Sequence, residues 1–288
     1  MLTPEELREL RKLHITAGRR VDSLFGGDYR SAVRGRGMEF EEVREYHPGD
    51  DVRHIDWNVT ARTDRPHVKV FREERQVTVM LCVDVSGSTR VGTGGGDGRA
   101  SRRLQMARVA GGLAYASIRN RDTVGLVTFS DRIETVVLPR RTRGHAWAVI
   151  QAVFAARAEG SGTDIQAALA QVSRVQRRRA VLVVVSDFLD SKPWQRIMTA
   201  LAARHTVHAV LVHDPLDGQL PDLGLIDVYD PETGRTRVVD ARKVLAGPTV
   251  EERVSVLRRT GARTLALSTE DDPFVALHRH FQRQGGRR

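Results

Sequence analysis

Apolar and polar residues follow two different rhythms along this chain, and the change falls near residue 77. Beyond it, continuous runs rich in β-branched residues are separated by stretches with helical periodicity. Such runs are typical of strands buried on both faces of a parallel sheet. Their alternation with helices implies right-handed crossovers and predicts a doubly wound, mostly parallel α/β sheet over residues 77–288. The predicted strands span 77–85, 123–130, 180–188 and 206–214, and the predicted helices about 101–119, 145–158, 164–176 and 193–204.

The C-terminal part of the chain adds a hairpin and a closing unit to this sheet. LIDVYD and TRVVD flank the turn-forming residues 231–234, which predicts a hairpin inserted at the sheet edge. Residues 262–268 are predicted to form the last strand, and residues 272–283 a closing helix.

The first 76 residues are predicted to form a small helical and β appendage. Thr3 is a helix N-cap followed by Pro4, and Glu6 stands three residues after the cap, so a helix is predicted to about His14. Residues 15–76 are polar, with short β-like pieces and the turn signal HPGDD.

Composition narrows the class of protein. The chain has 288 residues, 40% of them hydrophobic, which is enough for one large core. It contains no apolar run near the ~20 residues of a spanning helix and no apolar signal segment, so we expect a cytoplasmic protein without membrane insertion. The lone cysteine, Cys82, lies in an apolar run and predicts a buried thiol.

The formal charge of +10 raises the alternative of nucleic-acid binding. All but four of the 46 basic residues are arginines, and they are spread along the whole chain. The densest clusters, at 140–143 and 177–179, have no interleaved aromatic residues for base stacking. A solvated basic face is therefore the favoured interpretation.

Polar side chains follow the predicted strands where those strands end. Asp84, Ser86 and Ser88 follow the first strand, Asp187 follows the third, and Thr163 precedes the helix predicted from 164. In open parallel sheets, ligands bind at the carboxyl ends of the strands. Oxygen donors without Cys or His suit Mg²⁺, and also Mn²⁺ or Ca²⁺, better than zinc.

Each of these residues also has a simpler interpretation. Thr163 and Asp187 could be helix caps. The serines could be nucleophiles, yet DVSGS is not a Gly-x-Ser-x-Gly elbow, and no histidine follows a comparable strand. An aspartyl phosphatase usually has a second carboxylate two residues on, where this chain has Ser86. The coincidence of the three segments favours a metal site.

Two stretches resemble known families. Asp84, Ser86, Ser88, Thr163 and Asp187 resemble the D-x-S-x-S, T, D pattern of the metal-ion-dependent adhesion site in von Willebrand factor A domains. Residues 35–62 resemble the signature of the domain-of-unknown-function 58 family, bacterial proteins that carry an A-type domain. The signature residues present are Glu39, Phe40, Arg44, Tyr46, Pro48, Gly49, Asp50, Asp51, Arg53, Asp56 and Trp57.

These resemblances imply a function. Ser86, Ser88 and Thr163 would bind Mg²⁺ directly, and Asp84 and Asp187 would act largely through bound waters. An acidic residue of a protein partner would complete the coordination shell of this non-enzymatic interaction module. Similar bacterial proteins accompany MoxR-type AAA+ ATPases, which suggests an adaptor or assembly role. A metal-dependent hydrolase using the same carboxylates and Arg-mediated nucleic-acid binding remain the alternatives.

The signature stretch itself is expected to be structural. Its charges are too mixed in sign for a metal cage, and Tyr46 and Trp57 are expected to anchor packing. We therefore predict an ion-pair and aromatic network that fixes the appendage to the α/β domain, with a second partner surface as the alternative.

Overall fold

The computed structural model describes residues 39–72, 77–90, 101–156, 158–160, 162–215, 217, 225–230, 235–240 and 247–285. The helix predicted from Thr3 and the glycine-rich stretch 92–98 lie outside these residues. The chain divides into two compact units, one comprising Arg34–Gln76 and the other containing Val77–Arg288. Each unit is described here by itself.

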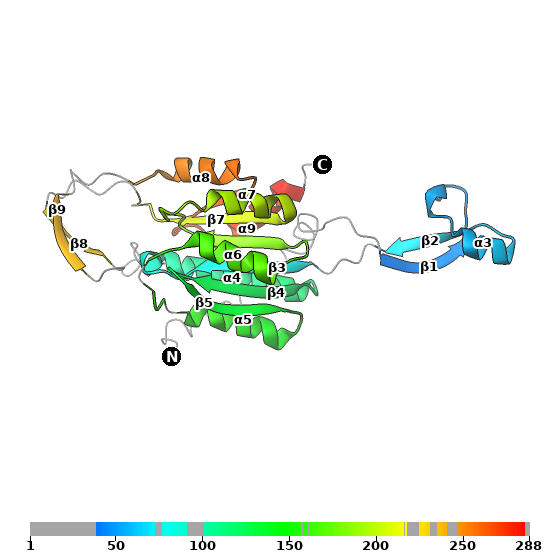
Figure 1. Cartoon of the computed structure of the whole chain (residues 1–288), viewed down its shortest axis with the longest axis horizontal. Coiled ribbons are helices and arrows are strands. Elements are labelled where there is room, and N and C mark those ends of the chain that lie inside the picture. The colour runs from blue at the N-terminus through cyan, green and yellow to red at the C-terminus, as the bar shows by residue number, and fades with distance from the viewer. Residues whose placement is uncertain are drawn as a thin grey trace. The chain divides into compact units, whose positions relative to one another are not determined.

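A six-stranded sheet in the order β10-β7-β6-β3-β4-β5 forms the centre of the larger unit (Figure 1). All neighbouring pairs are parallel except β4 and β5. The doubly wound, mostly parallel α/β fold is therefore confirmed. The strands are β3 (Thr78–Asp84), β4 (Thr123–Phe129), β5 (Ile133–Arg140), β6 (Val181–Ser186), β7 (Thr206–His213) and β10 (Arg263–Ser268).

The predicted central strands are buried because their residues are apolar on both faces. Residues 79–83 of β3 are at most 1% exposed, and Cys82 lies among them as a buried thiol. The antiparallel edge strand β5 was not predicted, since its half-exposed positions alternate with exposed ones instead of forming a continuous apolar run.

Three helices cover each face of the sheet and enclose separate apolar cores. Figure 1 shows the sheet between these two layers. The sequence pattern predicted all of them except α8, which begins with a capping box between Thr249 and Glu252. One face carries α4 (Arg102–Arg119), α5 (Arg143–Ala155) and α9 (Pro273–Gly285), and the other carries α6 (Ile165–Val175), α7 (Gln195–Arg204) and α8 (Val250–Arg259).

The predicted hairpin is present, but it does not extend the central sheet. Strands β8 (Leu225–Asp230) and β9 (Arg235–Asp240) pair antiparallel as a sheet of their own. The expectation of insertion at the sheet edge is therefore wrong. Among the described residues, β8 and β9 pair only with each other.

The smaller unit is built on the pairing of β1 (Glu39–Glu45) with β2 (His67–Arg72). Between these strands lie a 3₁₀ helix, η1 (Val52–His54), and α3 (Trp57–Thr63), whose N-cap is Asp56. Trp57 was expected to anchor packing, but it is 70% exposed. It stands in the first turn of a short helix none of whose residues is buried, so Trp57 does not pack into the core of this unit, and its role in fixing the unit to the α/β domain stays a prediction.

Candidate metal centre

The polar side chains after β3 and β6 lie at the point where the chain reverses direction across the sheet. From β3 the chain proceeds to β4 and β5 on one side, and then to β6, β7 and β10 on the other. Strands β3 and β6 are parallel neighbours, with Val83 opposite Val185. Their carboxyl ends therefore form the topological switch point, where open α/β sheets bind ligands.

Asp84 is held rigidly by three neutral donors. Its Oδ1 accepts hydrogen bonds from the Ser86 hydroxyl at 2.6 Å and the Ser86 amide at 2.9 Å, and its Oδ2 accepts one from the Ser186 hydroxyl at 2.7 Å. The hydroxyls of Ser86 and Ser88 are 3.0 Å apart. The DVSGS segment thus gathers one carboxylate and two hydroxyls, and β6 contributes a third hydroxyl.

Asp187 is the second buried carboxylate of this cluster. Its Oδ1 accepts a hydrogen bond from the Leu189 amide at 3.2 Å. Its Oδ2 is buried and accepts no hydrogen bond within the described part of the chain. Arg102 Nη1 lies 3.8 Å from that oxygen, which is an ion-pair distance but too long for a hydrogen bond.

Burial raises the pKa of both carboxyl groups. The pKa of Asp84 rises to about 7, because the group is removed from water and lies near the charge of Asp187. The pKa of Asp187 is also raised by burial, and Arg102 and Arg253 counteract that rise in part. Ionising either carboxyl therefore costs free energy at this site, and the hydrogen-bond donors on Asp84 are all neutral.

This arrangement fits a hard divalent cation. Its donor atoms are carboxylate and hydroxyl oxygens, and the Asp187 Oδ2 is a buried acceptor without a hydrogen-bond donor. No group of three or more His, Cys, Asp or Glu side chains that could hold a metal occurs among the described residues. A cation at this site would therefore depend on the serine and threonine hydroxyls as ligands.

Thr163 reaches the same edge of the sheet from a third segment. It is half-buried, and the amide of the next residue, Asp164, donates to the carbonyl of Ser130 at 2.8 Å, just beyond the end of β4. Asp164 caps α6 and pairs with Lys192 at 2.7 Å. Hydrogen bonds connect Asp84, Ser86 and Ser88, and the charge of Asp187 acts on Asp84. Thr163 is positioned through the backbone hydrogen bond of the next residue, Asp164.

Two buried arginines border the site, and no sequence pattern indicated them. Arg102 donates to the carboxylate of Asp217 and lies 3.4 Å from the Ser88 carbonyl. Arg253 donates to the Asp187 carbonyl at 2.8 Å and also contacts Asp217, at 3.4 Å. They come from the first turns of α4 and α8, in a chain so rich in arginine that neither position stands out.

The buried histidines of the larger unit interact elsewhere. His208 Nδ1 lies 2.9 Å from His280 Nε2, and burial lowers the pKa of both rings. Desolvation also lowers the pKa of His205. No described hydrogen bond links any of the three to Ser86 or Ser88, so none occupies the position of a general base.

Comparisons with known sequences identify similar proteins. A family model described as "Protein of unknown function DUF58" matches residues 42–256. Uncharacterized proteins of Mycobacterium bovis and Mycobacterium tuberculosis are 33% identical over 278 residues, a match that covers 93% of this chain and 86% of theirs.

Two solved structures have a similar fold. The conserved hypothetical protein BatB from Bacteroides thetaiotaomicron aligns over 72% of this chain and 98% of its own, with a TM-score of 0.51 and 16% identity. An aerotolerance-related membrane protein from Bacteroides fragilis, solved with multiple mutations to serines, aligns over 74% of this chain and 100% of its own, with the same TM-score and identity.

These likenesses correct the expected cytoplasmic location. The Bacteroides fragilis structure belongs to a membrane protein, so this fold occurs in proteins of membranes. In the described part of the chain, no helix has the length and apolar character needed to span a bilayer. The lack of a spanning segment in a chain of this fold was therefore not a valid reason to predict the cytoplasm.

Proposed function

Because the chain belongs to the DUF58 family, whose function is unknown, we propose that it is a protein-interaction module that binds a partner's carboxylate through a divalent cation. The cation, Mg²⁺ in the first instance and Mn²⁺ or Ca²⁺ as alternatives, would be held at the switch point of the sheet. Its ligands would be Asp84, Ser86, Ser88, Thr163 and Asp187.

The observation that carries this proposal is the pair of buried carboxylates. Asp84 and Asp187 are each 1% exposed, burial raises the pKa of both, and the charge of Asp187 raises the pKa of Asp84 further. Buried charges are costly unless they are paired or coordinate a metal. Of these two carboxylates, Arg102 forms an ion pair only with Asp187, at 3.8 Å, so within the described residues the charge of Asp84 is left for a ligand to compensate.

The donor types decide what such a cation could do. If neutral hydroxyls of Ser86, Ser88 and Thr163 contact the cation directly, and Asp84 and Asp187 act through water, the cation keeps most of its positive charge. A carboxylate from a protein partner is the ligand that this residual charge favours. The chain's own residues would position the ion and exclude bulk water from beneath it.

We propose binding and not turnover as the activity. Within the described residues, the neighbours of the Ser86 hydroxyl are Asp84 and Ser88, and neither His nor Lys hydrogen-bonds to it. A hydrolase that used Asp84 would need a general base in that position. The partner is proposed to be a protein with an accessible acidic residue, and a MoxR-type AAA+ ATPase is the candidate that the family resemblance suggests.

The first experiment measures the cation directly. Mn²⁺ and Mg²⁺ are titrated calorimetrically into the wild type, Asp84→Asn and the matched control Asp122→Asn. Asp122 is also a buried carboxylate, but it accepts a hydrogen bond from the Val77 amide at the opposite end of the sheet. We expect wild type and Asp122→Asn to bind one ion, and Asp84→Asn to bind about a hundredfold more weakly.

The second experiment tests the partner. A protein captured by the wild type in Mg²⁺ should be lost both in EDTA and with Asp84→Asn, and be retained with Asp122→Asn. Capture that is equal under all these conditions would exclude a metal bridge. Turnover of a phosphate ester or peptide that requires both Mg²⁺ and Asp84 would favour the hydrolase instead.

A further inference from the structure

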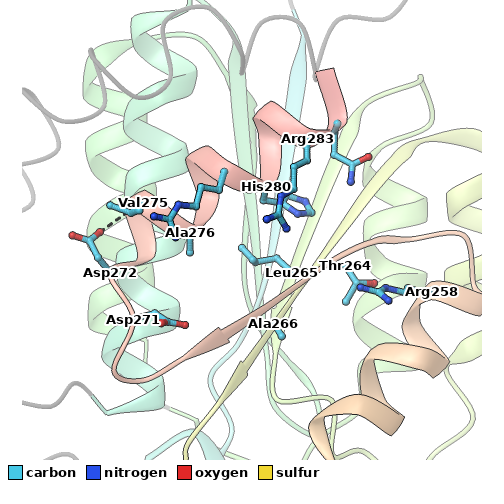
Figure 2. A pocket seen from close by; sticks show the side chains of 12 residues that line it. Arg258, Thr264, Leu265, Ala266, Asp271, Asp272, Val275, Ala276, His280 and Arg283 are labelled. Atoms are coloured by element: carbon cyan, nitrogen blue, oxygen red, sulfur yellow. Dashed lines mark hydrogen bonds between the residues drawn. The ribbon is translucent and has the colours of Figure 1, made fainter. Parts of the chain in front are cut away.

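Strand β10 forms one edge of the central sheet, and that edge lies open in a groove. Among the described strands, β10 pairs with β7 alone. The groove has a volume of about 860 Å³ and is lined by β10, by Arg258 of α8, and by α9 with the turn before it. Figure 2 shows β10 between these two helices, with Arg258 directed toward Thr264.

The hydrogen bonds around β10 establish which of its backbone groups face the groove. The Thr269 amide donates to the His213 carbonyl of β7 at 2.9 Å, so alternate residues back from Thr269 face β7. Ser268 faces away, because its amide donates to Asp271 at 2.8 Å and its carbonyl accepts from Gln105 at 3.0 Å. By the same alternation, Thr264 and Ala266 direct their N–H and C=O groups outward.

These outward N–H and C=O groups form an open sheet edge with which an additional strand could pair. Thr264 and Ala266 both line the groove, and Ala266 is exposed. In the described structure, no hydrogen bond reaches the backbone N–H or C=O of either residue from outside the central sheet. Unpaired edge groups of this kind bind extended peptides by adding a strand to the sheet.

The charges around the groove indicate which peptide would fit. Arg258, Arg279 and Arg283 line it and are exposed, and their side chains make no hydrogen bond or ion pair with the residues that the structure describes. The two acidic residues in the lining, Asp271 and Asp272, accept hydrogen bonds from the neutral amides of Ser268, Phe274 and Val275 and so keep their charges. The arginines outnumber these aspartates and come from both flanking helices, so the lining has a positive balance.

We propose that this groove binds an extended acidic segment of a protein partner, which adds a seventh strand beside β10. Its backbone would pair with Thr264 and Ala266. Acidic side chains on one face of the added strand would reach Arg279 and Arg283, and those on the other face would reach Arg258, because side chains alternate along a strand. The proposal is independent of the cation site.

The probe is a fluorescein-labelled peptide with the repeat Glu-Glu-Thr-Thr, as long as β10, which places glutamates on both faces of an added strand. Binding is followed by fluorescence anisotropy. The variant Ala266→Pro removes one outward N–H donor and keeps the pairing with β7, since proline is tolerated on the open side of an edge strand. A second variant combines Arg279→Ala with Arg283→Ala. The matched control is Arg196→Ala, which removes an exposed arginine from α7 outside the groove.

We expect the peptide to bind the wild type and Arg196→Ala alike, and to bind both groove variants at least about tenfold more weakly. The same peptide with N-methyl groups on alternate residues should lose affinity by a similar factor, which tests strand pairing even if Ala266→Pro fails to fold. In hydrogen exchange, bound peptide should slow the exchange of the Ala266 amide.

Several results would overturn the proposal. No binding to the wild type at about 1 mM peptide would do so, since specific peptide sites are tighter than that. Affinity that survives N-methylation, or equal binding of oligothymidylate, would indicate a non-specific basic surface. Binding should persist in EDTA and with Asp84→Asn, so failure here and failure of the cation site are distinguishable.

Discussion

Asp50 in the smaller unit and Asp84 in the larger one are both aspartates, but their surroundings shift the carboxyl pKa in opposite directions. Asp50 accepts two hydrogen bonds from the Arg44 guanidinium, at 2.7 and 2.8 Å, and its pKa is lowered to about 2. Asp84 accepts its hydrogen bonds from hydroxyls and an amide, and its pKa is raised to about 7. Asp50 is thus paired with the Arg44 cation, whereas Asp84 forms no ion pair with the residues that the structure describes.

Asp50 forms an ion pair that stabilises a turn, whereas only neutral groups donate hydrogen bonds to Asp84. The Arg44 and Asp50 pair also receives the His47 amide at 2.9 Å, so it fixes the turn between β1 and η1. Asp84 is fixed equally well, but its negative charge is uncompensated. Neutral donors orient a carboxylate without using its charge, which leaves that charge for an incoming cation.

The most severe test of this contrast is Arg102→Met. Arg102 is buried between Asp187 and Asp217, so its loss removes the ion pair of Asp187 and leaves Asp217 paired with Arg253 alone. Removing one member of a buried ion pair costs about 3 kcal/mol of the free energy of unfolding. Urea unfolding without divalent ions measures this loss. We also expect tighter Mg²⁺ binding than in the wild type, and unchanged affinity would mean that Arg102 does not oppose a cation.

The next effect, of opposite sign, is that of Asp84→Asn on the metal-free protein. The substitution keeps the shape of the side chain and removes a buried charge that lacks a cation. Unfolding in EDTA should therefore require about 1–2 kcal/mol more free energy than in the wild type. A loss of stability instead would mean that Asp84 is compensated within the chain, as Asp50 is.

The smallest effect is expected for Asp50→Asn, because exposed ion pairs contribute little to stability. Its pKa is lowered from 3.8 to about 2 in the folded chain, so its stabilising effect is present above about pH 4 and is lost as pH falls toward 2. Hydrogen exchange of the His47 amide measures this. In Arg44→Lys the His47 amide should exchange faster than in the wild type, since lysine lacks the planar fork that binds both carboxylate oxygens.

The sequence predicted the fold well where each element has a pattern of its own. β3, β4, β6 and β7 lie within their predicted ranges because continuous β-branched runs are typical of strands buried on both faces. The half-exposed edge strand β10 also lies within its predicted range. The other edge strand, β5, was missed because its half-exposed positions alternate with exposed ones.

The site was predictable only where its residues are adjacent in the chain or follow a strand. The grouping of Asp84, Ser86 and Ser88 required no tertiary information beyond the end of β3. Arg102, Arg253 and Asp217 meet there through side-chain reach from three distant segments, which no local pattern encodes. The cluster of oxygen donors could therefore be anticipated, but not the positive charges beside it.

The burial of Cys82 makes the thiol chemistry of the chain insensitive to redox conditions. The only thiol of the chain lies at the centre of β3, is 1% exposed, and has a pKa raised by burial. A buried, protonated thiol reacts slowly with oxidants and alkylating reagents. Because the chain has a single, buried cysteine, its folding involves no intrachain disulfide and does not depend on the redox state of the solution.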